Sequence, residues 1–308
     1  MFESMIIGPS KVGKTALVAT LSHATDMANI VDDLNIDVIG DNKDTQMLFS
    51  NALKVAQTGD IGLAGTASIT NYEFRLILEE KPSDLIRQII SNLFGVSRVE
   101  GRFHFMDSPG GAVFETSLAE GGGIATTSPY FKSIAEKMTK SKGLILCVDA
   151  NDIFSDRRQF IKDFFYHSLN TLLANGYRIS LPFERIAIVL TKADLWAQNS
   201  GHLDDAESFV EGSDPVGLAF DIIGKKTFNA LRTYLVDEAK IAFAFTSVYG
   251  FDNGGINNKL LSIQPGNVMD LEAWRPFQIL DPFAFLTTGK AFSSGTTILD
   301  KEGLVERL

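Results

Sequence analysis

The sequence predicts a three-layer α/β fold, in which helices cover both faces of a mainly parallel central sheet. Short apolar segments alternate along the chain with longer segments whose apolar residues recur at helical spacing, the order typical of parallel βαβ units. Two segments, 143–148 and 186–190, are almost continuously apolar, as strands are when helices cover both of their faces. With 308 residues, of which 45% are hydrophobic, the chain can form one enlarged domain with a substantial core.

The individual elements are expected in the following order. The first strand, 5–7, is followed by a helix that begins near Lys14. Later strands are expected at 72–78, 103–106, 143–148, 186–190 and 241–245. Later helices are expected at 45–57, from Pro82 to about residue 93, and at 129–140, 156–174 and 216–239. Apart from 45–57, residues 25–65 have no regular pattern.

Composition and charge exclude several classes of function. The formal net charge is −10 and the sequence pI is about 4.9, which argues against general binding to nucleic acid or to an anionic membrane surface. The single cysteine, Cys147, lies in an apolar segment, so no internal disulfide is possible. No apolar run reaches the roughly 18 residues of a membrane span, and the N-terminus does not resemble a signal peptide. We therefore expect a cytoplasmic protein with no transmembrane segment.

Residues 8–15, Gly-Pro-Ser-Lys-Val-Gly-Lys-Thr, match the phosphate-binding pattern G-x-x-x-x-G-K-[ST]. Gly8 and Gly13 permit backbone angles that let successive N–H groups point at phosphate oxygens. The helix that follows adds the positive end of its dipole. We expect Lys14 to contact the β- and γ-phosphates and the Thr15 hydroxyl to bind Mg²⁺. The expected phosphate-binding residues are Gly8, Ser10, Lys11, Val12, Gly13, Lys14, Thr15 and Ala16.

A carboxylate at a second strand end is the next expected part of the site. Asp107 directly follows the strand at 103–106, where it can hold Mg²⁺ through water. It also begins the pattern D-x-x-G, in which the N–H of Gly110 can sense a γ-phosphate. A threonine ahead of the strand at 72–78 would complete the metal site, and Thr66 and Thr70 are both candidates. The sequence does not distinguish between the two.

A base-recognition pattern follows the strand at 186–190. Thr191-Lys192-Ala193-Asp194 matches [NT]-K-x-D. The Asp194 carboxylate can accept hydrogen bonds from the N1–H and the exocyclic amine of guanine, whereas adenine presents an acceptor at N1. The stem of Lys192 can lie over the base. After the last strand, Ser247 and the backbone N–H of Val248 can contact the guanine O6.

Several other residues are interpreted as structural. Asp149 and Asp152 end a strand at the same edge and are expected to be loop and helix-cap residues. The four histidines are scattered, without the spacing of a metal site. Two aromatic segments, 274–277 and 282–285, are either core or an apolar patch for a partner.

The four patterns GPSKVGKT, DSPG, TKAD and FTSV together resemble those of a divergent Ras-like small GTPase of the translation-factor-related P-loop GTPase class. They stand in the order of that family and cover residues 1–250, which we expect to be the GTPase domain; residues 251–308 are then a C-terminal extension packed on it. The resemblance implies a P-loop NTPase fold with a six-stranded sheet, GTP or GDP with Mg²⁺ as cofactors, and a prokaryotic member of the class. It also implies switch segments that the γ-phosphate orders, and a protein effector or activating partner.

The resemblance assigns roles to residues of this chain. Catalysis would involve Lys14, Thr70 and Gly110. The metal would be held by Thr15, Thr66 or Thr70, and Asp107. The nucleotide would be held by the phosphate loop together with Thr191, Lys192, Asp194, Ser247 and Val248.

Two departures from the family pattern stand out. The interval between the phosphate loop and Asp107 is about twice that of a minimal Ras-like domain, which implies a helical insertion at about 25–100, before the second switch. Gly111 occupies the position where Ras-like proteins usually have a glutamine that orients the attacking water. We therefore expect slow hydrolysis, unless Glu115, Glu120 or a partner supplies the missing group.

Two alternatives remain open beside a slow GTPase switch. The chain could be a scaffold or interaction module that binds GTP without hydrolysing it, which Gly111 favours. It could instead be a P-loop ATPase or small-molecule kinase. The relative affinity for GTP and ATP distinguishes this last class from the other two.

Overall fold

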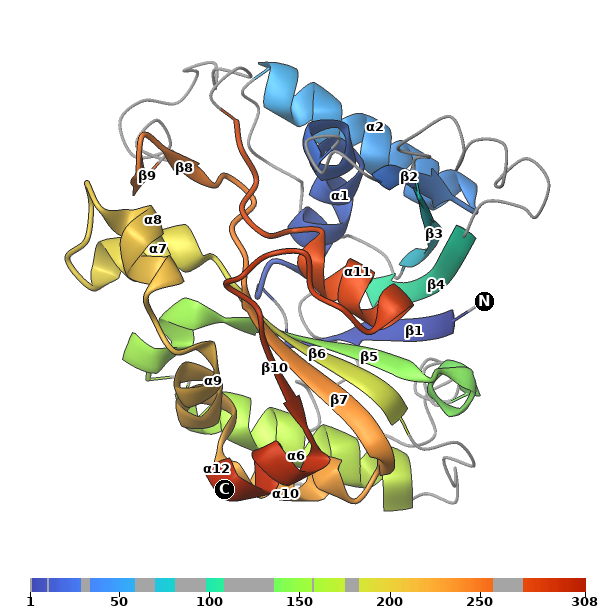
Figure 1. Ribbon diagram of the computed structural model, residues 1–308, viewed down its shortest axis with the longest axis vertical. Coiled ribbons are helices and arrows are strands. Elements are labelled where there is room, and N and C mark those ends of the chain that lie inside the picture. Colours follow the sequence, from blue (N-terminus) through green and yellow to red (C-terminus); the bar gives the residue numbers. More distant parts are fainter. Residues whose placement is uncertain are drawn as a thin grey trace, which may run out of the picture.

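The computed structural model describes residues 2–9, 11–28, 34–58, 70–80, 98–107, 136–156, 158–174, 183–256 and 274–308. Within these residues a central eight-stranded sheet carries helices on both faces (Figure 1). The strand order is β10-β7-β6-β5-β1-β4-β3-β2. The expected three-layer α/β fold with a mainly parallel sheet is therefore confirmed.

The strands of this sheet pair in parallel at its centre and antiparallel at its margins. β1, β4, β5, β6 and β7 form the parallel centre, whereas β3 is antiparallel to both of its neighbours and β10 is antiparallel to β7. The strands are β1 Phe2–Ile7, β2 Leu34–Gly40, β3 Thr70–Glu80, β4 Arg98–Asp107, β5 Gly143–Asp149, β6 Phe183–Thr191, β7 Leu235–Phe245 and β10 Thr297–Asp300. A separate hairpin consists of β8 Phe251–Asp252 and β9 Gly255–Ile256.

The helices divide between the two faces. α1 Lys14–Ala28, α2 Lys43–Thr58 and α11 Asp281–Thr288 lie on one face, and α6 Arg158–Ala174, α9 Pro215–Ile223, α10 Lys225–Arg232 and α12 Lys301–Arg307 lie on the other (Figure 1). The remaining labelled helices are η2 Ala150–Phe154, α7 Ala193–Asn199 and α8 Ala206–Glu211. None of the described helices has the length and apolar character that crossing a membrane requires.

Each face of the sheet has its own hydrophobic core. In β5, Leu144 and Leu146 face the core under α6 and α9, while Ile145 and Cys147 face the core under α1 and α11. This alternation explains why the sequence of β5 is apolar at nearly every position. Where β3, β4 and α11 meet, three buried rings pack together, those of Phe74, Phe103 and Phe283.

The expected helix at 216–239 is wrong in its second half. The structure has two helices, α9 and α10, separated by Gly224 at φ +87°, and residues 235–239 already belong to β7. Gly224 ends α9 because a left-handed backbone angle cannot continue a right-handed helix. β7 then pairs with β6 and buries Leu235 and Ala239, so sheet pairing outweighs the local helical pattern.

The sequence had predicted a helical insertion at about 25–100, but the described residues of this range include strands as well as a helix. The expected helix at 45–57 corresponds to α2, but residues 34–40 form the edge strand β2, which pairs antiparallel with β3. The helix expected after Pro82 lies outside the described residues. Of the helix expected at 129–140, residues 136–140 are described and are helical.

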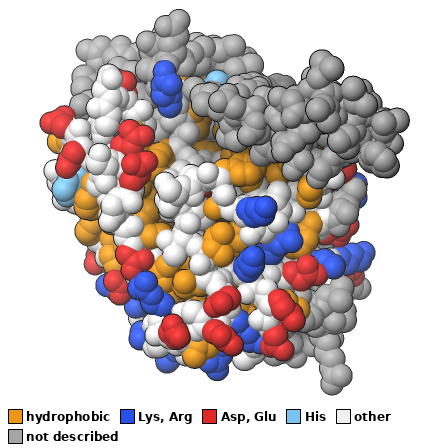
Figure 2. Space-filling view, in the orientation of Figure 1, with side chains coloured by type: hydrophobic (Ala, Val, Ile, Leu, Met, Phe, Trp, Pro, Cys, Tyr) orange, Lys and Arg blue, Asp and Glu red, His pale blue; other side chains and the backbone are white. Residues whose placement is uncertain are grey.

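The described residues after 250 contribute to the sheet and to both of its cores. β10 adds an edge strand beside β7, and α11 buries Phe283, Phe285 and Leu286 against the sheet. Trp274, Phe283 and Phe285 are buried and Phe277 is partly buried, so neither 274–277 nor 282–285 forms the exposed apolar patch that the sequence had allowed. Around β10 and α12 acidic and basic side chains are interspersed (Figure 2). Lys301 and Asp237, for example, form an ion pair of 2.8 Å.

Candidate functional site

The expected phosphate loop, residues 8–15, connects β1 to α1 at the carboxyl edge of the sheet, and its glycines are sterically required. A Cβ on Gly8 would lie 2.4 Å from the carbonyl oxygen of Cys147 in β5, so only glycine allows the two backbones to approach this closely. Gly13 has φ +88° and Lys11 has φ 66°, both in the left-handed region. These angles turn the loop back into the first turn of α1, which contains Thr15 and Ala16.

The Lys14 ammonium lies across its own loop. Its Nζ donates hydrogen bonds to the carbonyl oxygens of Gly8, at 2.9 Å, and Pro9, at 2.6 Å. The positive charge is thus held at the N-terminus of a 15-residue helix, where the helix dipole also favours an anion. Beneath the loop, burial raises the pKa of the Cys147 thiol to about 12, so this cysteine remains a protonated core residue.

The end of β6 is attached to the phosphate loop by two side chains. The buried Thr191 hydroxyl contacts the carbonyl oxygen of Val12 at 2.5 Å and that of Val148 at 3.0 Å. The Lys192 ammonium donates to the carbonyl oxygen of Lys11 at 2.8 Å. Residues of two separate sequence patterns therefore meet in one site.

Asp149 takes part in this site in a way that the sequence did not indicate. It caps the 3₁₀-helix η2 by accepting from the Asn151 N–H at 2.9 Å, as expected of a cap. Its other carboxylate oxygen forms a 2.6 Å ion pair with Lys192. The available signal was the parallel pairing of β5 and β6, which places Asp149 opposite Thr191, next to Lys192.

The residues expected to recognise the base also converge. Asp194 lies in the first turn of α7 with 2% exposure, and the Ser247 hydroxyl donates to its Oδ1 at 2.7 Å. The same hydroxyl oxygen accepts from the Gly250 N–H at 2.9 Å. Burial, and to a smaller extent the negative charge of Asp194, raise the pKa of Tyr249 above its usual value. The ends of β6 and β7 thus hold a buried carboxylate in a fixed orientation.

The backbone places part of the expected metal site together. β1 pairs with β4 so that Ile6 lies opposite Phe105, and Asp107, two residues further on, is therefore level with Gly8. Thr70, the first residue of β3, is the register partner of Asp107. Ser10, Thr66, Gly110, Gly111, Glu115 and Glu120 lie outside the described residues.

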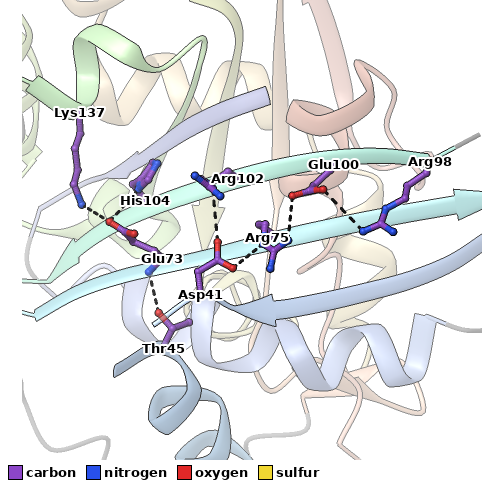
Figure 3. Close-up of polar contacts among 9 residues, drawn as sticks. All are labelled: Asp41, Thr45, Glu73, Arg75, Arg98, Glu100, Arg102, His104 and Lys137. Atoms are coloured by element: carbon purple, nitrogen blue, oxygen red, sulfur yellow. Dashed lines mark hydrogen bonds and ion pairs between the residues drawn. The ribbon is translucent and has the colours of Figure 1, made fainter. Parts of the chain in front are cut away.

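A polar network on β3 and β4 holds α2 beside the strand that begins at Thr70 (Figure 3). Glu73 pairs with Lys137 at 2.8 Å and lies 3.4 Å from His104 Nδ1, and its backbone N–H donates to the Thr45 hydroxyl at 2.8 Å. The hydrogen bond from Lys137 is the main reason why the pKa of Glu73 is lowered. The pKa of His104 is lowered chiefly by burial. Further along, Arg75 pairs with Asp41, which precedes α2, at 2.6 Å.

No protein-family model matches the sequence, and no curated protein matches it either. Among solved structures the chain is similar to the signal recognition particle receptor SRb-GTP/SRX complex from Chaetomium thermophilum, with 13% identity and a TM-score of 0.37 over 82% of this chain and 94% of that one. It is also similar to the ADP-ribosylation factor-like GTP-binding protein, small COPII coat GTPase SAR1, from Encephalitozoon cuniculi in complex with GDP. There the identity is 12% and the TM-score 0.32, over 89% of this chain and 77% of that one.

A third similar structure is the Ski7 GTPase-like domain of S. cerevisiae bound to GDP and inorganic phosphate. Its identity is 13% and its TM-score 0.34, over 86% of this chain but only 46% of that one. None of these comparisons supports the prokaryotic origin expected from the sequence. At such low identities and TM-scores the likenesses are distant, and the function of this chain has to be inferred from its own residues.

Proposed function

We propose that the chain is a GTP-binding molecular switch, which binds GTP or GDP with Mg²⁺ and hydrolyses GTP slowly. The observation that carries this proposal is the attachment of residues 191–192 to the phosphate loop, through Val12 at 2.5 Å and Lys11 at 2.8 Å. Asp194 follows Lys192 by two residues. A guanine held by Asp194 would therefore belong to the same ligand as phosphates held by residues 8–15.

Base recognition would depend on Asp194 and Ser247. The carboxylate of Asp194 would accept from the guanine N1–H and exocyclic amine, and the Ser247 hydroxyl keeps it oriented. The Val248 N–H would donate to O6. The Lys192 stem, fixed at its ammonium by Asp149 and the loop, would cover one face of the base.

Phosphate binding would be electrostatic and positional. Lys14 and the amides of residues 11–16 would face the β- and γ-phosphates at the N-terminus of α1. Their fixed positions would stabilise the charge that spreads over the phosphoryl oxygens during transfer. Gly110 would add one N–H for the γ-phosphate.

The oxygen donors near the loop fit Mg²⁺, which prefers hydroxyl, carboxylate and water ligands. Thr15 would bind the ion directly and Asp107 through water. Thr70 and Thr66 remain the candidates for the threonine ligand, and the register of Thr70 with Asp107 favours Thr70. When bound, the ion would neutralise charge shared between the β- and γ-phosphates.

Gly111 bears on the rate of hydrolysis. Because glycine has no side chain with which to orient a water molecule, hydrolysis would be slow until a partner protein, Glu115 or Glu120 supplies that group. The same residue favours a second candidate function, a GTP-dependent scaffold without hydrolysis. Single-turnover hydrolysis measured with purified chain distinguishes the two, since a scaffold leaves bound GTP intact.

The direct test of the proposal is Asp194→Asn. An asparagine amide can donate to the C2 carbonyl of xanthine but cannot accept both guanine N–H groups. Guanosine diphosphate affinity should fall by roughly one to two orders of magnitude, while xanthosine diphosphate affinity should rise. Calorimetric titration with guanosine diphosphate and with xanthosine diphosphate measures this change in nucleotide preference.

The matched control is Asp221→Asn, which removes a carboxylate that is two-thirds exposed and lies on the opposite side of the sheet from α1. It should leave both affinities unchanged. Unaltered guanine affinity in Asp194→Asn would contradict the proposed base recognition. Tighter binding of ATP than of GTP by the unmodified chain would assign it instead to the ATPase or kinase class.

A further inference from the structure

A short segment of the C-terminal region packs against the loop that contains Ser247 and Val248. We name residues 246–250 the base-reading loop and residues 274–277 the base-loop clamp. Ser247 donates its N–H to the Phe277 carbonyl at 3.1 Å and accepts from the Phe277 N–H at 2.8 Å. In Figure 1 this segment runs into α11 beside the turn that follows β7. The two segments therefore form a small backbone ladder.

Trp274 connects the base-reading loop to α1. Its Nε1–H donates to the carbonyl oxygen of Val248 at 2.7 Å, and the residue is only 3% exposed. Its ring stacks on His23 of α1, with centroids 4.1 Å apart and ring planes 9° from parallel. Since α1 begins at Lys14, one indole contacts both the helix of the phosphate loop and the loop assigned to the base.

The far end of the base-reading loop is held just as tightly. Gly250 has φ +67°, and a Cβ there would meet the carbonyl carbon of Arg275 at 2.6 Å, so the clamp leaves no room for a side chain. The Gly250 N–H donates to the Ser247 hydroxyl, which in turn donates to Asp194. Movement of the base-loop clamp would therefore shift the Ser247 hydroxyl, which donates a hydrogen bond to Asp194.

From these contacts we infer that Trp274 is a positioning residue for guanine recognition, acting through Val248 and Ser247. This inference rests on the proposed function, because it concerns the same site. The Trp274 hydrogen bond fixes the peptide that follows Val248, and the ladder with Phe277 fixes Ser247. Together they aim the Val248 N–H and the Asp194 carboxylate at the edge of the base.

The test is Trp274→Phe, which removes the indole N–H but keeps an aromatic ring against His23. Release of a fluorescent GDP analogue should accelerate by roughly threefold to tenfold, the equivalent of one hydrogen bond. The ratio of GDP affinity to inosine diphosphate affinity should also fall, because inosine lacks the exocyclic amine that Asp194 reads. A purely structural effect would weaken both nucleotides equally and leave this ratio unchanged.

Two further variants make the test independent of stability. Phe183→Leu loosens the core at the opposite end of β6 from Thr191, and should lower the melting temperature without changing the release rate or the ratio. His23→Leu removes the ring stack from the α1 side but keeps the indole hydrogen bond, and should accelerate release to a smaller extent than Trp274→Phe.

The possible failures are distinguishable. If the unmodified chain binds GDP and Trp274→Phe keeps the same release rate and the same GDP-to-inosine ratio, the positioning role is wrong and the proposed function stands. Equal effects of Trp274→Phe and Phe183→Leu would likewise reject it. If the unmodified chain binds no guanine nucleotide in the presence of Mg²⁺, both the proposed function and this inference are overturned.

Discussion

At the scale of single residues, the phosphate loop is shaped by backbone contacts that a side chain would disturb. Gly8 faces the backbone of β5, and a Cβ would come within 2.4 Å of the Cys147 carbonyl oxygen. Backbone in the middle of a sheet cannot move aside as the end of a flexible side chain can. The identity of this residue therefore bears on both folding and the proposed phosphate binding.

We predict that Gly8→Ala destabilises the chain by about 1–3 kcal/mol, the usual range for overpacking a core, and weakens GDP binding. Thermal unfolding and GDP titration measure the two effects. Gly217→Ala is the matched control, because Gly217 lies within α9 and its new Cβ would have its nearest contacts with the side chain of Asp214, at 3.0 Å or more, rather than with backbone. Equal stability of the two variants would contradict this account of Gly8.

The sequence patterns identified most of the residues that meet at the site, because each follows a strand end. The phosphate loop, Thr191, Lys192, Asp194 and Ser247 all lie at the carboxyl edge of the sheet, as a parallel sheet requires. The contacts of Trp274 with Val248 and His23 could not be predicted. They join segments far apart in the sequence, and no local pattern specifies which distant ring will pack on a given loop.

At the scale of elements, the prediction of secondary structure succeeded where the local pattern and the tertiary environment agree. β5 and β6 were predicted from continuous apolar runs, because they are buried on both faces. β2 was missed although apolar Leu34, Ile36 and Val38 alternate with polar Asn35 and Asp37, the pattern of a strand with one exposed face, and the structure pairs it with β3. Near its start, β7 has Asp237 and Glu238 at exposed positions, where the local sequence does not distinguish a helix from a strand.

The network between α2, β3 and β4 predicts how stability depends on pH. Burial lowers the pKa of His104 in the folded state, so the unfolded chain binds a proton more readily than the folded chain. The contribution of neutral His104 is therefore complete above its ordinary pKa of about 6.5 and is lost as the pH falls below it. Glu73, with its lowered pKa, adds a second loss below its ordinary pKa of about 4.3.

We expect the melting temperature to decrease between pH 7 and pH 5, and His104→Phe to reduce this decrease. The replacement keeps a ring in the same half-buried position but cannot take up a proton. Calorimetric melting curves across this range provide the measurement. As a control, His202, which is more than one-third exposed beside Asp205, can be replaced in the same way. If His104→Phe retains the full pH dependence, another group is responsible.

At the scale of the whole molecule, the C-terminal residues complete the sheet. β10 extends it beside β7. On the face that also carries α1, α11 packs on β7, β6, β5, β1, β4 and β3. Arg185 in β6 donates to the carbonyl oxygens of Leu286, at 2.5 Å, and Thr287, at 3.0 Å. These hydrogen bonds attach the C-terminal end of α11 to the sheet. We therefore propose that the GTPase domain over 1–250 depends on residues 274–308 for its core.

A chain that ends at residue 250 is predicted to be unfolded or aggregated, because it exposes the apolar face that Phe283, Phe285 and Leu286 cover. Removal of residues 301–308 alone deletes α12, of which Leu304 is the buried residue, and should lower the melting temperature while leaving GDP binding intact. Circular dichroism and nucleotide titration of the two truncated chains measure the difference. A folded, nucleotide-binding chain of 250 residues would contradict the proposal.

The contact between the Thr191 hydroxyl and Val12 has a consequence for how a ligand arrives. It holds the loop in shape through the protein's own atoms, together with the Lys192 contact to Lys11. The conformational entropy of this loop is therefore lost when the chain folds, and ligand binding does not have to order the loop again. Association of GDP should follow a single exponential, and the observed rate should rise linearly with GDP concentration. A slow rearrangement of residues 8–15 would instead make this rate reach a plateau.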